Sequence, residues 1–296
     1  MADKIKKPLV QLNSAAAKLG DGWSGRFAIN DSAGDRISLD DWNQALADID
    51  SLLSNPVETL RDQKHSKVIR KDITIGGKEF AVIVKHERPV RGVRDYHHVF
   101  IPARAFRFFK IAARLAENGI PSVFPLAALQ RKSSLLTTDS ILITEYTPQS
   151  EDLYWFMRNN RCTPALKEGM CIQIATIFAS LHKCGLQHRD AKAQNLLVTP
   201  VRGGDSCKVS LLDLDGVKSY VVKSSSLRFR PLAKLAATLL SFGEINMTDY
   251  LRAFTIYCNL TDIDATRRKE IFRTIARQAV AIRLLTMAKT ATESTK

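Results

Sequence analysis

Hydrophobic positions repeat with a helical period early in the chain and then alternate. Between residues 39 and 53 they recur every three or four positions, behind a start of capping-box type at Ser38-Leu39-Asp40-Asp41. This spacing predicts one helix that ends at Asn55-Pro56. Strands are expected at 57–61, 67–75 and 78–86, with Gly76-Gly77 as the turn of a hairpin. Residues 1–37, rich in Gly, Ser, Ala and Asp, are expected to be loosely ordered.

Helical patterns dominate further along the chain. A helix is predicted at 103–118, closed by Gly119, before two strands at 123–129 and 141–146. The remaining patterns predict helices at 164–184, 230–242, 247–258 and 264–289 and a short strand at 208–213. We therefore expect an α+β fold of two lobes with a ligand cleft between them. Its predicted parts are an N-terminal extension with one helix at 1–55, a β-rich N-lobe at 56–146 and an α-helical C-lobe at 147–296.

Composition places the chain among globular proteins. Hydrophobic residues make up 45% and charged residues 25% of its 296 residues. No apolar run approaches the roughly 18 residues of a membrane span, and the polar, basic opening has no signal-peptide character. The five cysteines form no CxxC pair, and Cys171 is expected in the core. These features favour an intracellular protein.

Positive charge is concentrated in one part of the sequence. The net charge is +14, but residues 1–60 carry 6 Lys/Arg against 9 Asp/Glu, and residues 61–110 carry 13 against 5. Such a basic block indicates an anionic partner, which can be nucleotide phosphates, an acidic glycolipid, an anionic membrane or nucleic acid. A solvated basic surface explains it equally well, so charge alone does not choose.

The strongest candidate chemistry lies between residues 188 and 216. His188-Arg189-Asp190-Ala191-Lys192-Ala193-Gln194-Asn195 follows a long helix, and Leu211-Leu212-Asp213-Leu214-Asp215-Gly216 comes after it. Phosphoryl transfer needs a base that orients the nucleophile and oxygen ligands for magnesium. Asp190 can accept a hydroxyl proton, Asn195 and Asp213 can hold Mg²⁺, and Lys192 can reach toward the transferred phosphate. The pattern matches the catalytic loop and metal-binding Asp of the protein-kinase-like superfamily.

Candidate ATP-binding residues lie in the predicted N-lobe. Lys85 ends an apolar strand face, where kinases place a lysine on the nucleotide phosphates; a surface lysine is the alternative. The turn before it, Asp62 to Ser66, has no glycine, although Lys64 and the Ser66 hydroxyl could bind phosphate; a plain turn fits as well. Glu145-Tyr146 ends the last strand of the predicted N-lobe. It resembles a kinase hinge, whose backbone forms hydrogen bonds with adenine, but a simple linker between the lobes is the alternative.

One kinase element is missing from the sequence. The helix at 103–118 offers no acid opposite Lys85, because its glutamate, Glu117, lies at the far end. Another acid, such as Glu87 or Asp95, could take this role, or the lysine works differently. This departure counts against an ordinary protein kinase.

The chain resembles the lipopolysaccharide kinase family, which phosphorylates heptose or keto-deoxy-octulosonic acid in lipid A–core sugars. The likeness runs from about residue 60 to 258. Four stretches carry it: Ile83-Val84-Lys85 with Arg88-Pro89-Val90-Arg91-Gly92; Ala105-Phe106-Arg107-Phe108-Phe109-Lys110 with Gly119-Ile120-Pro121; Ile143-Thr144-Glu145-Tyr146; and His188 to Asn195 with Leu212-Asp213-Leu214-Asp215. By resemblance Asp190 is the base, Lys85 the ATP lysine, and Asn195 and Asp213 the metal ligands.

The leading hypothesis is therefore an ATP- and Mg²⁺-dependent kinase for a sugar hydroxyl of a lipopolysaccharide-type glycolipid. Peripheral contact with an anionic membrane, at the inner face of the inner membrane, is a further expectation for this cytoplasmic protein, and nucleic acid is not an expected partner. A protein Ser/Thr kinase or another small-molecule kinase is the first alternative, since Lys192 is typical of the former. A nucleotide-binding pseudokinase is the second. The sequence does not identify the acceptor hydroxyl or the oligomeric state.

Overall fold

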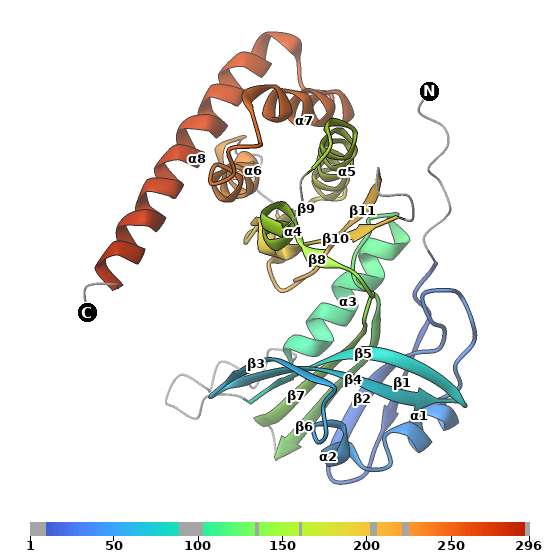
Figure 1. The fold of residues 1–296 in the computed structure, drawn as a ribbon. Helices are drawn as coiled ribbons and strands as arrows, with labels where there is room; N and C mark the ends of the chain where they lie inside the picture. The colour runs from blue at the N-terminus through green and yellow to red at the C-terminus, as the bar shows by residue number, and fades with distance from the viewer. Residues whose placement is uncertain are drawn as a thin grey trace. The chain divides into compact units, whose positions relative to one another are not determined.

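The computed structural model describes residues 10–88, 103–133, 136–159, 162–201, 206–220 and 225–293. The chain forms two compact units, Met1–Thr147 and Pro148–Lys296 (Figure 1). Strands dominate the first unit and helices the second, so the expected α+β class is confirmed.

The first unit is built on one antiparallel sheet of seven strands in the order β1-β2-β6-β7-β5-β4-β3. In chain order the strands are β1 Ser14–Lys18, β2 Trp23–Ala28, β3 Glu58–Gln63, β4 Ser66–Ile75, β5 Lys78–Glu87, β6 Pro125–Ser133 and β7 Leu136–Glu145. The predicted meander corresponds to β3, β4 and β5. Gly76 and Gly77 join β4 to β5 with φ of +58° and +78°, the left-handed conformations that this two-residue turn requires.

The expectation that residues 1–37 are loosely ordered is wrong for β1 and β2. Trp23 and Phe27 of β2 are buried in the core, and Gly25 lies between them on the same face. A Cβ atom at Gly25 would come within 2.8 Å of Leu129 on the neighbouring strand, so the position needs glycine. Gly25 in β2 and the run of alanines in β1 hide the alternation of apolar and polar residues that would have predicted these strands. Strands β1 and β2 thus belong to the sheet of the first unit.

The single helix predicted at 39–53 is two short helices, α1 Leu39–Ala45 and α2 Ile49–Leu52. The capping box at Ser38 is confirmed, since Ser38 Oγ accepts from the Asp41 N–H at 3.1 Å and Asp41 Oδ2 accepts from the Ser38 N–H at 2.8 Å. Asp48 then accepts from the Ser51 N–H at 3.1 Å and starts a second helix. An N-capping side chain in mid-pattern therefore interrupts the helix while the apolar spacing continues.

Helix α3 Arg104–Glu117 packs against β6 and β7, as Figure 1 shows, and its predicted end at Gly119 is confirmed with φ of +65°. The other face of the sheet, with α1 and α2, encloses a core that includes Phe27, Trp42, Ile69 and Ile143. The sheet is therefore packed on both faces.

The second unit is mainly helical. Its helices are α4 Leu153–Asn159, α5 Pro164–Lys183, α6 Ser225–Leu239, α7 Met247–Leu260 and α8 Ala265–Glu293. Its short strands are β8 Glu151–Asp152, β9 Leu186–His188, β10 Leu196–Pro200, β11 Cys207–Leu211 and β12 Val217–Ser219, and a 3₁₀ turn, η2, covers Ala193–Asn195. The helices α5 to α8 and strand β11 were predicted, whereas α4 and the other four strands were not. No helix in the described ranges is both long and apolar enough to cross a membrane.

Candidate functional site

Two short strands hold the loop from His188 to Asn195, the candidate catalytic loop, in the second unit. β9 pairs with β12, which places His188 opposite Val217, and the Arg189 N–H donates to the Gly216 carbonyl at 2.8 Å. The Leu212 N–H donates to the Asn195 carbonyl at 3.0 Å. The loop from His188 to Asn195 is therefore fixed against residues 212–217, which are distant in sequence.

Asp190 is the centre of this cluster. The Asn195 amide donates to both the main-chain carbonyl of Asp190 at 2.8 Å and its Oδ2 at 3.2 Å, and the Lys192 ammonium lies 3.1 Å from the same Oδ2. Burial raises the pKa of Asp190, but the hydrogen bond and charge of Lys192, helped by Asn195, outweigh it and hold the pKa below its ordinary value. Asp190 is thus an ionised carboxylate whose side chain is 53% exposed and reachable by a substrate.

Asp213 lies beside this cluster. Its Oδ1 accepts from the Asp215 N–H at 3.1 Å, and the preceding residue is bonded to Asn195. Burial lowers the pKa of His188, while the backbone and charge of Asp213 and the charge of Asp190 act on the same ring in the opposite direction. The structure therefore brings Asp190, Lys192 and Asn195 into contact and sets Asp213 close to them.

The donor set suits a magnesium ion. Because the Asn195 amide nitrogen is engaged with Asp190, its amide oxygen remains as a possible metal ligand, together with the Asp213 carboxylate. Mg²⁺ is commonly held by one or two protein oxygens plus substrate phosphates. Within the described part of the chain, no group of three or more His, Cys, Asp or Glu could hold a metal. A two-ligand arrangement of Asn195 and Asp213 would suit this kind of magnesium coordination.

Gly216 is a site residue that the sequence argument did not single out. A Cβ atom there would lie 2.8 Å from the His188 ring and 3.3 Å from the Asp190 Cβ. The glycine lets the two segments approach closely enough for the Arg189–Gly216 hydrogen bond. Its position directly after Leu212-Asp213-Leu214-Asp215 was the signal that could have revealed it.

In the first unit, Lys85 has an acidic partner on its own strand. Its ammonium lies 3.2 Å from Glu87 Oε1, which also lies 3.4 Å from the Arg104 guanidinium at the start of α3. Of the two acids proposed from the sequence, Glu87 therefore contacts Lys85, and Asp95 lies outside the described residues together with the stretch 89–92. Lys85 is 30% exposed, so its ammonium remains reachable.

Ser66 lies on the same face of the sheet as Lys85. The register places Ser66 opposite Glu87 and Val68 opposite Lys85, and directly opposed residues of an antiparallel pair share a face. Ser66 Oγ is buried and has no hydrogen-bond partner among the described residues. Lys64 occupies the exposed turn between β3 and β4. An orphaned hydroxyl on the sheet face that also carries Lys85 fits a phosphate group.

Glu145 and Tyr146 are engaged within the first unit. Their main-chain N–H groups donate to the carbonyls of Phe124 at 3.0 Å and Ala81 at 2.9 Å. Burial raises the pKa of Glu145, whose Oε1 accepts from the Ser32 N–H at 2.9 Å, and the Arg70 guanidinium lies 4.7 Å from the centre of the Tyr146 ring. The side chains thus hold this segment in place, and adenine binding by its backbone stays a prediction.

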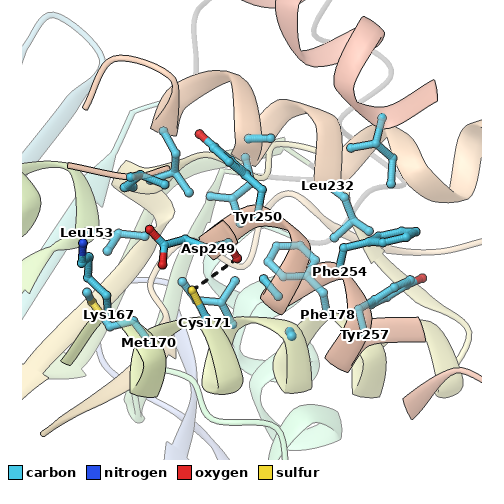
Figure 2. Close-up of a pocket in the computed structure, with 18 of the residues that line it drawn as sticks. Leu153, Lys167, Met170, Cys171, Phe178, Leu232, Asp249, Tyr250, Phe254 and Tyr257 are labelled. Atoms are coloured by element: carbon cyan, nitrogen blue, oxygen red, sulfur yellow. Dashed lines mark hydrogen bonds between the residues drawn. The ribbon is translucent and has the colours of Figure 1, made fainter. Parts of the chain in front are cut away.

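A separate apolar cavity of about 140 Å³ lies among the helices of the second unit (Figure 2). Its lining comes mainly from α5, α6 and α7, with Met170, Phe178, Leu235, Tyr250, Phe254 and Tyr257 among its members. Cys171 borders it, and its thiol lies 3.7 Å from the Asp249 carbonyl. Burial raises the pKa of Cys171 to about 11, which makes this thiol a poor nucleophile at neutral pH. None of the predicted site residues lines the cavity.

The sheet-rich first unit, the helical second unit and the loop from His188 to Asn195 define the protein-kinase-like class of fold. The sequence profile described as "Lipopolysaccharide kinase (Kdo/WaaP) family" matches residues 90–254, more than half of the chain. The chain belongs to this family, as its motifs led us to expect.

Named relatives agree with this assignment. The chain is 27% identical over 156 residues to 3-deoxy-D-manno-octulosonic acid kinase of Haemophilus influenzae, covering 51% of this chain and 63% of the relative. It is 27% identical over 150 residues to the lipopolysaccharide core heptose(I) kinase WaaP of Pseudomonas aeruginosa, covering 49% and 55%. The matches thus span less than two thirds of these relatives.

A solved structure supports the fold. A WaaP structure, determined in complex with acyl carrier protein, superposes on this chain with a TM-score of 0.54 at 22% sequence identity. The match covers 78% of this chain and 91% of that one. At this identity the likeness concerns the fold alone.

Proposed function

We propose that this protein transfers the γ-phosphoryl group of ATP to a sugar hydroxyl of a lipopolysaccharide-type glycolipid. The observation that carries the proposal is the contact of Asp190 with Lys192 and Asn195 next to Asp213. Family membership supports a sugar acceptor, since two of the relatives are named as kinases of 3-deoxy-D-manno-octulosonic acid and of lipopolysaccharide core heptose.

Asp190 orients the acceptor hydroxyl and receives its proton. Its lowered pKa keeps it ionised at neutral pH, so the carboxylate accepts a hydrogen bond from the hydroxyl before transfer. A strongly basic group is not needed, because the transition state of phosphoryl transfer is loose. Lys192, 3.1 Å from Asp190, offers positive charge beside the oxygen atoms of the transferred group.

Asn195 and Asp213 are the proposed magnesium ligands. A bound Mg²⁺ would neutralise charge on the phosphates during transfer. The hydrogen bonds of Asn195 to Asp190 fix its side chain, so the metal ligand and the base keep a constant relation. In the first unit, Lys85, the Ser66 hydroxyl and the exposed Lys64 are the proposed phosphate contacts.

Glu87 replaces the helix acid in this proposal. It holds Lys85 by an ion pair and links it to α3 through Arg104. The strand therefore supplies both the lysine and the acid, and the helix supplies a cation. The ion pair limits the rotamers of Lys85 and directs its ammonium along the face that also carries Ser66.

A sugar acceptor is favoured over a protein acceptor by the short connection after Asp215. Helix α6 begins at Ser225, so few residues separate it from the metal ligand. A protein kinase needs an activation segment at this place to bind its substrate. The pseudokinase alternative is disfavoured because all the proposed catalytic side chains are present. With such an acceptor, the proposed place of action is the cytoplasmic face of a membrane.

The proposal is tested by incubating purified protein with γ-labelled ATP, Mg²⁺ and separate lipopolysaccharide, lipid-free core sugar and protein fractions. We expect label in the lipopolysaccharide and core-sugar fractions and none after chelation of Mg²⁺. Label in the protein fraction alone would favour the protein-kinase alternative. Nucleotide binding without transfer to any fraction would favour the pseudokinase.

A further inference from the structure

The last part of α8 exposes an apolar surface. Ile271, Ile275 and Ala279, spaced by four residues, are buried, and this helix packs against α6. From Val280 to Thr292 no residue of α8 is buried, and in Figure 1 this part of the helix runs past α6. Four of the twelve exposed large hydrophobic side chains among the described residues lie in this segment: Val280, Leu284, Leu285 and Met287, which are 50% to 65% exposed.

These side chains fall on one side of the helix. At 100° per residue, Met287, Val280 and Leu284 form a stripe, and Ala281 and Ala288 fill the interval between that stripe and Leu285. The apolar arc covers almost half of the circumference and points away from the buried positions. Arg283 and Lys289 border it on its two edges, where long basic side chains can extend to a charged surface.

We infer that the segment Val280–Thr292 of α8 is an amphipathic anchor for an anionic phospholipid membrane. Over its whole length α8 carries seven Lys or Arg against two Glu, on a chain of net charge +14. A helix with an apolar face bordered by basic residues lies in the plane of a membrane surface, with its apolar side chains among the acyl chains. Negative headgroups complement the basic border.

Charge also argues against two other occupants of this face. A second copy of the chain would bring the Arg283 and Lys289 borders of two helices together, which repel one another. An uncharged apolar protein surface would leave the basic border without a partner. The inference extends the proposed function, because a glycolipid acceptor is embedded in a membrane, but lipid binding is measured without ATP or acceptor.

The test is flotation of the full chain with vesicles of phosphatidylethanolamine and phosphatidylglycerol, or of phosphatidylcholine alone. We expect binding to the anionic vesicles only. Leu284→Gln with Met287→Gln should weaken it about tenfold or more, and Arg283→Gln with Lys289→Gln about 25-fold at low salt. The matched control is Val57→Gln with Leu60→Gln, which alters two similarly exposed apolar residues in the first unit and should bind like the parent.

Equal binding of vesicles by the α8 variants and the parent would overturn the inference. It would also be overturned if the vesicles remain unbound while Leu284 is needed for a dimer or for a complex with a soluble acidic protein. Thermal unfolding confirms that the variants are folded. Transfer to a lipid-free core sugar separates the two proposals, because the α8 variants should retain it. If the parent transfers to no acceptor yet binds the vesicles, the proposed function fails and the membrane anchor stands.

Discussion

At the scale of single residues, the least expected contact is the one between Lys85 and Glu87. The two side chains project from the same strand two positions apart, and Arg104 shares the carboxylate. Because these groups are partly exposed, the ion pair contributes little to stability. Its effect should instead be on the position of the Lys85 ammonium, and hence on nucleotide binding and transfer.

A double-mutant cycle tests this role. Lys85→Ala should lower kcat/KM for ATP by about two orders of magnitude, because it removes a phosphate contact. Glu87→Gln should lower it about tenfold and should have almost no further effect when Lys85 is already alanine. Glu87→Asp should recover part of the loss. The control is Glu58→Gln, an exposed change on β3 that should leave the kinetics unaltered.

Full additivity of the Lys85 and Glu87 effects would show that Glu87 acts elsewhere. Unchanged kinetics for Lys85→Ala would make this lysine a surface residue and move the phosphate contact to another group.

The pH dependence of transfer should report the contact between Lys192 and Asp190. With its pKa below the ordinary value of 3.8, Asp190 stays ionised through neutral and mildly acidic pH. The folded protein favours the ionised form of Asp190. This form is lost only when the pH falls below that value and the carboxylate is protonated. Lys192→Gln removes the main opposing interaction and leaves burial, which raises the pKa, so the acid limb of the rate profile should move to higher pH.

The measurement is kcat/KM against pH for the parent and the variant, each normalised to its maximum because Lys192 is also a proposed contact of the transferred phosphate. Lys208→Gln, an exposed change on β11, provides the control. An acid limb that does not move would contradict the assignment of Asp190 as the group that Lys192 keeps ionised.

The magnesium ligands are tested by replacement of each. Asn195→Ala should abolish Mg²⁺-dependent turnover because it removes a proposed ligand oxygen, and Asp213→Asn should do so because it replaces a charged carboxylate by a neutral amide. Circular dichroism should show the fold retained. Near-parental activity in either variant would remove that residue from the metal site.

At the scale of elements, the pairing of β9 with β12 decides the geometry of the site. Each strand has three residues, and Gly216 lies directly before β12, against His188 and Asp190. Two strands of this length share few hydrogen bonds. The position of β9 and β12 therefore depends on the close approach of the segments that contain His188 and Gly216. A methyl group at position 216 should therefore affect both stability and catalysis.

Gly216→Ala should cost about 1–3 kcal/mol in the free energy of unfolding, as for other overpacked positions, and should lower kcat more than it raises KM. Gly169→Ala is the matched control: this glycine lies inside α5 with no atom within 4 Å of its Cβ position, so alanine should stabilise by about 0.5–1 kcal/mol. Chemical denaturation gives both values. Equal effects of the two changes would contradict the close contact at Gly216.

Long elements with a clear period were predictable from the sequence, and short or irregular ones were not. The periods of α3, α5, β4 and β5 extend over ten or more residues, so the pattern stands out. β9 and β12 are too short to show a period, and β2 carries a glycine at an inward position. Asp48 split one predicted helix through a local hydrogen bond that the apolar spacing does not record.

The same reasoning applies to the site. Asp190, Lys192 and Asn195 lie close together in the sequence, so their motif was readable, and the structure places them in contact. The contact of Glu87 with Arg104 joins a strand to a helix across a sequence separation of 17 residues, and only the folded chain reveals it. The proposed catalytic roles of all these residues stay predictions until they are measured.

At the scale of the whole molecule, each unit contributes a different kind of chemistry to the proposed reaction. The first unit carries the proposed phosphate contacts around Lys85, the second carries the proposed base and metal ligands, and α8 extends the second unit with a basic, apolar surface. A sugar kinase acting on a membrane-embedded acceptor would use all three. The central claim, however, is chemical: Asp190 directs phosphoryl transfer to a hydroxyl.

Asp190→Asn is the most direct test of that claim, since it keeps the size of the side chain and removes its charge. The measurement is the rate of transfer from γ-labelled ATP to lipopolysaccharide and to lipid-free core sugar, with nucleotide affinity determined in parallel. We predict that the parent transfers, that the variant binds ATP with similar affinity, and that its rate falls by about two to four orders of magnitude. Transfer by the variant at the parental rate, or no transfer by the parent to any acceptor, would contradict the account.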